Sequence, residues 1–218
     1  MVTQITDGTA FDKHGRPFRR RSFLPAVILF ASLAVVTLLV WVIALSRPPD
    51  IREAAVCNPP PAQADPEEPG LQLGEPKPRD EMIDVTPAKL ADTKIRVLNA
   101  SGQGGHAGEV AGALRDLGFA NPEAANDPIY QTARLECQGQ IRFGPSGRAS
   151  AAAVWLVAPC TELFQDERTD DTVDLALGTD FTTLSRSDNI DAVLASLLPD
   201  ATQPADPALL SKIHNGTC

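Results

Sequence analysis

The chain has 218 residues, enough for one membrane-spanning segment and one modest globular domain. Its formal net charge of −9 is unevenly divided: residues 1–23 carry five Lys or Arg against two Asp, whereas residues 47–218 carry 14 against 26 Asp or Glu. An acidic C-terminal part is unsuited to nucleic acid, whose binding needs clustered cations, and three histidines supply few general bases or metal ligands. We therefore expect no nucleic-acid partner, no metal site and no cofactor.

The first predicted element is a membrane-spanning helix over Leu24–Ser46, a stretch of 23 residues without a charge. A helix of this length covers about 34 Å, more than the roughly 30 Å of a hydrocarbon core. A cleaved signal peptide is the alternative, but its apolar region is usually about 7 to 15 residues long. The positive-inside rule places residues 1–23 in the cytosol and the rest outside, because the basic side chains precede the stretch: Lys13, Arg16, Arg19, Arg20 and Arg21.

The segment after the span, residues 47–92, is rich in proline, with ten of the chain's 19 prolines between residues 48 and 87. This composition predicts an extended, solvated stalk. All four cysteines follow the span, and an even number on the oxidising side of a membrane favours two disulfides.

Residues 93–199 carry the pattern of a globular domain, and residues 200–218 that of a helical tail. Short apolar runs alternate with amphipathic stretches, so we expect an α/β fold: a small two-layer sandwich with a mainly parallel sheet. Residues 121–128 are expected to form a loop, and the caps Ser146, Asp188 and Asp206 to begin helices. The expected strands are Ile95–Ser101, Gln140–Phe143, Glu162–Gln165 and Thr172–Leu177. Four helices are expected: one after Gly108, one at Arg148–Ala158, one at Ile190–Leu198, and a last one that begins at Asp206 and ends near Gly216.

This order of elements predicts the disulfide pairing. Cys137 lies just before one strand, and Cys160 lies just after the helix that follows it. In a parallel unit both positions fall at the same end of the sheet, so we expect a Cys137–Cys160 bridge, which leaves Cys57 for Cys218.

The glycine-rich run Gly102–Gly108, between a strand and a helix, loosely fits a dinucleotide-binding pattern. A domain of about 107 residues has no second mononucleotide half, so tight packing of strand and helix is the preferred interpretation. No G-x-S-x-G frame surrounds a serine, and no catalytic residue is predicted. Because a helix N-terminus can receive a ligand, the candidate ligand-binding residues are those around this turn: Asn99, Ser101, Gly102, Gly105 and His106.

The segment IRVLNASGQGGHAGEVAGALRDLGF resembles the opening of the LytR C-terminal domain family, with matches that include Val97, Asn99, Ser101, Gly105 and Phe119. The resemblance extends over about residues 93–184. It implies the family's α/β fold in a stand-alone, membrane-anchored member. The glycopolymer-transferring catalytic domain that usually accompanies this domain has no counterpart here, so its activity is not implied.

Together these features predict a non-enzymatic, single-pass membrane protein with an extracytoplasmic domain, and the resemblance implies that it contributes to cell envelope integrity. Its expected partner is a wall component or an envelope protein. An enzyme that modifies wall glycopolymer and a module that binds lipid or another small ligand are the alternatives.

Overall fold

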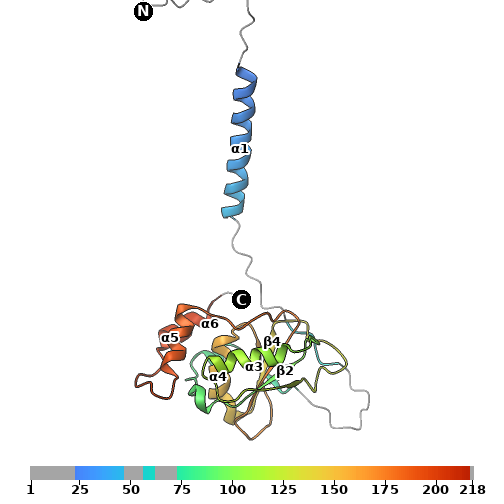
Figure 1. Cartoon of the computed structure of the whole chain (residues 1–218), viewed down its shortest axis with the longest axis vertical. Coiled ribbons are helices and arrows are strands. Elements are labelled where there is room, and N and C mark those ends of the chain that lie inside the picture. The colour runs from blue at the N-terminus through green and yellow to red at the C-terminus, as the bar shows by residue number, and fades with distance from the viewer. Residues whose placement is uncertain (1–22, 47–55, 62–72, 217–218) are drawn as a thin grey trace, which may run out of the picture. The chain divides into compact units, whose positions relative to one another are not determined.

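A computed structural model describes residues 23–46, 56–61 and 73–216 of the chain (Figure 1). The predicted basic segment before residue 23, the parts of the stalk at 47–55 and 62–72, and Cys218 lie outside the described residues. The chain divides into two compact units, residues 1–50 and residues 51–218, which are described separately.

The first unit contains helix α1 (Leu24–Ser46), whose bounds match the predicted span. Within the described part of the chain, α1 is the one helix long and apolar enough to cross a membrane. The hydroxyls of Ser32 and Thr37 donate to the carbonyl oxygens one turn before them, at 2.8 and 2.9 Å. The helix thus satisfies these polar groups internally, as a lipid environment requires.

The second unit is built on a mixed six-stranded sheet with the order β1-β5-β4-β6-β2-β3. The pairs β2/β3, β2/β6 and β4/β5 are parallel, whereas β4/β6 and β1/β5 are antiparallel. The strands are β1 (Glu75–Pro76), β2 (Ile95–Asn99), β3 (Glu123–Asn126), β4 (Gly139–Phe143), β5 (Glu162–Gln165) and β6 (Val173–Leu177).

The helices pack against the sheet and share its main hydrophobic core, which confirms the α/β class (Figure 1). Val97, Leu175 and Ile141 point from the three central strands into this core, and Trp155 is fully buried there. The helices are α2 (Asp80–Ile83), α3 (His106–Asp116), α4 (Arg148–Val157), α5 (Asp188–Ser196) and α6 (Pro207–His214), with 3-10 turns η1 (Leu90–Asp92) and η2 (Pro145–Gly147).

The helix caps follow the sequence only in part. Asp206 caps α6 as predicted and accepts a hydrogen bond from the amide of Ala208. For α5 the cap is Ser187 rather than Asp188, since the Ser187 hydroxyl accepts from the amide of Ile190. Ser146 does not cap α4, because the η2 turn runs directly into that helix.

Two stretches differ from their predicted structure. The expected loop at 121–128 contains β3, an edge strand whose four residues are all exposed and whose sequence EAAN gives no alternating apolar signal. The C-terminal part of the expected stalk packs into the domain, because Met82 and Leu90 are buried in the core.

The predicted disulfides are wrong, since Cys57 is bonded to Cys137. This bond excludes both predicted pairs, Cys137–Cys160 and Cys57–Cys218. Cys160 is disulfide-bonded as well. The predicted pairing follows from positions along the strands, whereas the actual pairing depends on the face of the sheet. Cys137 lies with Leu98 and Ala176 on the face opposite the helices, whereas the carbonyl oxygen of Pro159, beside Cys160, contacts Arg79 and Trp155 in the helix layer.

Candidate functional site

The predicted ligand-binding loop is organised around the side chain of Asn99 at the end of β2. Its Oδ1 accepts hydrogen bonds from the Ser101 amide, the Ser101 hydroxyl and the Gly102 amide, at 2.9 to 3.2 Å. Its amide nitrogen donates to the carbonyl oxygen of Gln103 at 2.7 Å. The Ser101 hydroxyl also accepts from the Gln103 amide. These contacts make Asn99 and Ser101 the internal frame of the turn.

The glycines of this loop serve its backbone conformation. Gly102 and Gly105 have φ of +75° and +83°, a region that residues with a side chain rarely adopt. A Cβ on Gly104 or Gly105 would meet no atom within 4 Å, so the predicted tight packing of strand on helix does not explain these two.

His106 begins α3 and is buried with its ring 5.9 Å from that of Phe181. Its Nδ1 has no hydrogen-bond partner among the described residues. A hollow of about 780 Å³ lies beside the loop, and its lining includes Asn99, Gly102 and Gly104 but not His106. The assignment of the loop to ligand binding stays a prediction.

A row of charged side chains crosses the sheet on the face opposite the helices. The strand register places Arg142 of β4 beside Asp174 of β6, Asp174 beside Arg96 of β2, and Arg96 beside Glu123 of β3. Alternate residues of a strand point to opposite faces, so these four side chains lie on the face opposite the core residues of the same strands. Charged groups thus form one line across four neighbouring strands.

The centre of this row is a chain of ion pairs. Arg96 donates to both oxygens of Asp174, at 2.7 and 2.9 Å, and Arg168 donates to Asp174 at 2.7 Å and also to Asp166. Burial alone would lower the pKa of Arg168, but the hydrogen bonds to the two carboxylates outweigh it and raise the pKa above its ordinary value. The guanidinium groups are therefore held in fixed orientations.

Arg96, Asp166 and Arg168 border a cleft of about 970 Å³ between the starts of β2 and β3 and the loop that joins β5 to β6. The cleft also presents Lys94, bonded to Asp171 at 2.9 Å; this contact lowers the pKa of Asp171 and raises that of Lys94. Its volume is typical of a small-ligand site. The charged lining consists of Asp92, Lys94, Arg96, Glu123, Asp166, Glu167, Arg168, Asp170 and Asp171.

The other end of the row lies in a buried polar network. Arg142 is 3% exposed and pairs with Asp127, which is fully buried, at 2.8 Å between Nη1 and Oδ2. Arg142 also donates twice to Gln140, whose amide donates to Glu162. Tyr130 covers the guanidinium with its ring 5.7 Å away. A buried charge pair needs such additional hydrogen bonds to offset its desolvation.

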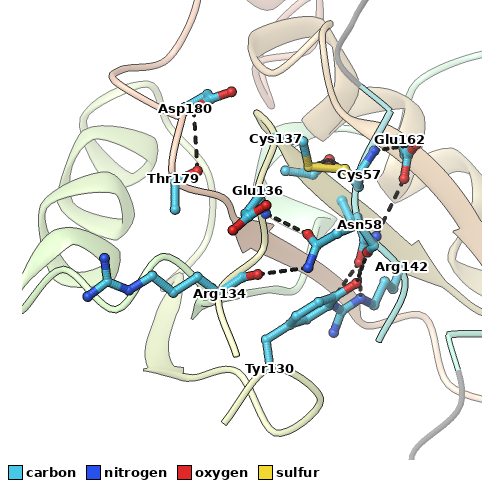
Figure 2. The surroundings of a disulfide bond; sticks show 12 residues. Cys57, Asn58, Tyr130, Arg134, Glu136, Cys137, Arg142, Glu162, Thr179 and Asp180 are labelled. Carbon is cyan, nitrogen blue, oxygen red and sulfur yellow. Dashed lines mark hydrogen bonds between the residues drawn. A yellow bond between two sulfur atoms is a disulfide. The ribbon is translucent and has the colours of Figure 1, made fainter. Parts of the chain in front are cut away.

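Residues 56–61, which we term the strap, contact this network through Cys57 and Asn58 (Figure 2). Besides the bond to Cys137, the strap amide of Cys57 donates to Glu162 at 3.1 Å. The side chain of Asn58 donates to the carbonyl oxygen of Arg134 and accepts from the amide of Glu136. The backbone carbonyl oxygen of Asn58 accepts from the Tyr130 hydroxyl. The strap is thus fixed to the loop before β4 by the disulfide and by the hydrogen bonds of Asn58.

Comparisons with known proteins agree with this architecture. The family described as LytR cell envelope-related transcriptional attenuator (LytR_C) matches residues 92–181. Over all 218 residues, the chain is 66% identical to the "Cell envelope integrity protein Cei" of Mycobacterium tuberculosis, covering 100% of both chains. The chain belongs to the Cei family. A solved soluble domain, residues 71–217 of a conserved hypothetical secreted protein from Mycobacterium marinum, is 68% identical with a TM-score of 0.67, covering 68% of this chain and 100% of that one.

In this Cei-family chain the LytR_C match contains the glycine loop and the charged row, but the strap lies before it. The row and the cleft were missed from the sequence. Their signal is a charged residue at an alternating position inside an apolar strand: Arg96 in IRVLN and Asp174 in VDLAL. Each charge alone indicates only a solvent-facing position, and the pairing depends on β2 and β6 being neighbours.

Proposed function

We propose that the chain is a membrane-anchored, extracytoplasmic protein that contributes to cell envelope integrity, the role named for its Mycobacterium tuberculosis relative. Helix α1 supplies the anchor, and the basic residues before it support a cytoplasmic N-terminus. The Cys57–Cys137 disulfide supports an oxidising compartment for the second unit.

We further propose that the protein acts by binding an envelope component in the cleft of the open sheet face, without catalysis. The observation that carries this proposal is the chain of ion pairs: both oxygens of Asp166, which lines the cleft, and of Asp174, which is buried beneath the arginines that line it, accept hydrogen bonds from those arginines. A general acid or base must instead exchange a proton with its substrate. Fixed, paired charges are suited to positioning a ligand through hydrogen bonds.

Photocrosslinking in living cells tests the proposal. A benzoylphenylalanine is placed in the full-length chain at Ala91, Asn121 or Glu123, which line the cleft and are exposed, in a mycobacterium without its own Cei. Glu109 on α3 and Ala192 on α5, exposed outside the cleft, are the matched controls. We expect a discrete crosslinked product from the cleft positions that the controls do not give. Equal crosslinking at both sets, or none at the cleft, would contradict binding at this cleft.

A further inference from the structure

The strap changes how far the domain can move from the membrane. From Ser46, at the end of α1, to Cys57 there are eleven residues. Because a residue extends at most about 3.6 Å, Cys57 stays within about 40 Å of the end of α1 in any conformation of the chain. If the strap were not attached, the first described residue of the domain would be Leu73, 27 residues from Ser46 and up to about 97 Å away.

The attachment is strong enough to act as this limit. The strap is held by one covalent bond and by four hydrogen bonds from or to Cys57 and Asn58, and Cys137 is only 1% exposed. Three prolines, Pro59–Pro61, follow these residues. Proline restricts the unbound chain to extended conformations, which reduces the entropy lost when the strap docks.

We propose that the strap confines the domain to a zone next to the membrane, where it binds the extracytoplasmic part of an integral membrane protein of the envelope. The inference rests on the proposed function because α1 must lie in the membrane. Residues 47–218 carry 14 basic against 26 acidic side chains, a balance that disfavours an anionic lipid surface as the partner. Lengthening the tether from 11 to 27 residues lowers the effective concentration of the domain at a membrane-proximal site about fourfold.

Insertions at two places in the full-length chain separate reach from folding. Sixteen Gly and Ser residues between Asp50 and Ile51 lengthen the tether to 27 residues and leave the disulfide in place. The same insertion between Gly70 and Leu71, after the strap, leaves the tether at eleven residues and serves as the matched control. The double variant Cys57→Ser/Cys137→Ser removes the covalent attachment, so the covalent tether runs on to Leu73 without any insertion.

Two measurements report on these variants. In nanodiscs, energy transfer from a fluorescent amino acid at Glu109 to acceptor headgroups should fall for the early insertion and the double serine variant, and stay at the wild-type level for the late insertion. In a mycobacterium without its own Cei, the late insertion should restore the exclusion of a dye from the cells to the wild-type level, whereas the early insertion should restore it only in part, as a fourfold lower effective concentration predicts. Crosslinks from Glu123 in the wild type should lead to a membrane protein.

Unchanged energy transfer for the early insertion would overturn the proposal. Full dye exclusion by that variant, or crosslinks to wall polysaccharide or lipid in place of a membrane protein, would do so as well. Failure of the proposed function has a different result: the cleft positions then give no crosslink above their controls, while energy transfer still responds to the position of the insertion.

Discussion

The buried pair of Arg142 and Asp127 should be among the most sensitive points of the domain, and a double-mutant cycle can measure it. Arg142 is 3% exposed and Asp127 fully buried, with 2.8 Å between Nη1 and Oδ2. Replacing Arg142 with Met leaves a buried carboxylate whose remaining donors are the amides of Ile129 and Tyr130, at 2.7 and 3.0 Å. Replacing Asp127 with Asn leaves a buried guanidinium bonded to the neutral Gln140.

Removing one partner of a buried ion pair costs about 3 to 5 kcal/mol, because the other charge stays desolvated. We therefore expect Arg142→Met and Asp127→Asn each to lower the free energy of unfolding by about 3 to 4 kcal/mol. The double variant has no buried charge left at this site and should lose about 3 to 5 kcal/mol, well short of the sum. The coupling energy is then about 3 kcal/mol.

Urea unfolding of oxidised residues 51–218, followed by circular dichroism, gives these values. The related solved domain from Mycobacterium marinum is itself soluble, which supports measuring the second unit without α1. Arg115→Met, on the exposed side of α3, is the matched control and should change the free energy of unfolding by less than about 0.5 kcal/mol. A loss below about 1 kcal/mol for Arg142→Met, or additive single losses, would refute the reasoning.

Three further outcomes follow from the same contacts. Cys57→Ser/Cys137→Ser opens a loop of 80 residues and should lower the free energy of unfolding by up to about 4.5 kcal/mol in the same assay; a loss under about 1 kcal/mol would contradict this. Burial, with the nearby Arg79 charge, lowers the pKa of His214 to about 4. The unfolded chain, with a His pKa of about 6.5, therefore binds more protons between pH 4 and 6.5, so stability should fall as the pH drops through that window. His214→Phe keeps the stacking on Trp155 and should remove this component from the pH profile of unfolding. Gly112→Ala, where a Cβ meets no atom within 4 Å, should raise the free energy of unfolding by about 0.8 to 1 kcal/mol through helix propensity; a destabilised variant would show that the site is constrained.

The elements that pack on the main core could be predicted from the sequence because their side chains carry its periodicity. Helix α3 buries Val110, Ala111 and Leu114 at helical spacing, and β5 has the predicted bounds. Strand β3 has no such pattern because all four of its residues are exposed, and its structure depends on pairing with β2. Periodicity reports burial, so an exposed edge strand gives no periodic signal.

The site was harder to predict because its contacts join distant parts of the chain. Arg96 and Asp174 are 78 residues apart, and only the placement of β6 beside β2 brings them together. The disulfide required a further kind of information. Cys137 is close in sequence to β4 and packs on the open face of the sheet. No pattern in a single sequence indicates which face of a sheet a loop will cover. Chain order alone therefore led to the wrong pairing.

The strap also changes where the anchor is joined to the fold, and this follows from the covalent connections. Without the disulfide, the chain from α1 would enter the sheet at β1, a strand with two residue pairs to β5 at the edge. With it, the chain is joined to Cys137, directly before β4, which pairs with both β5 and β6. The covalent path from the anchor therefore reaches an interior strand without passing through β1. The buried network of Arg142, Gln140 and Glu162 lies on that strand and its neighbour, next to the point of attachment, so Glu162 bonds both to the strap and to the network that links β4 with β5.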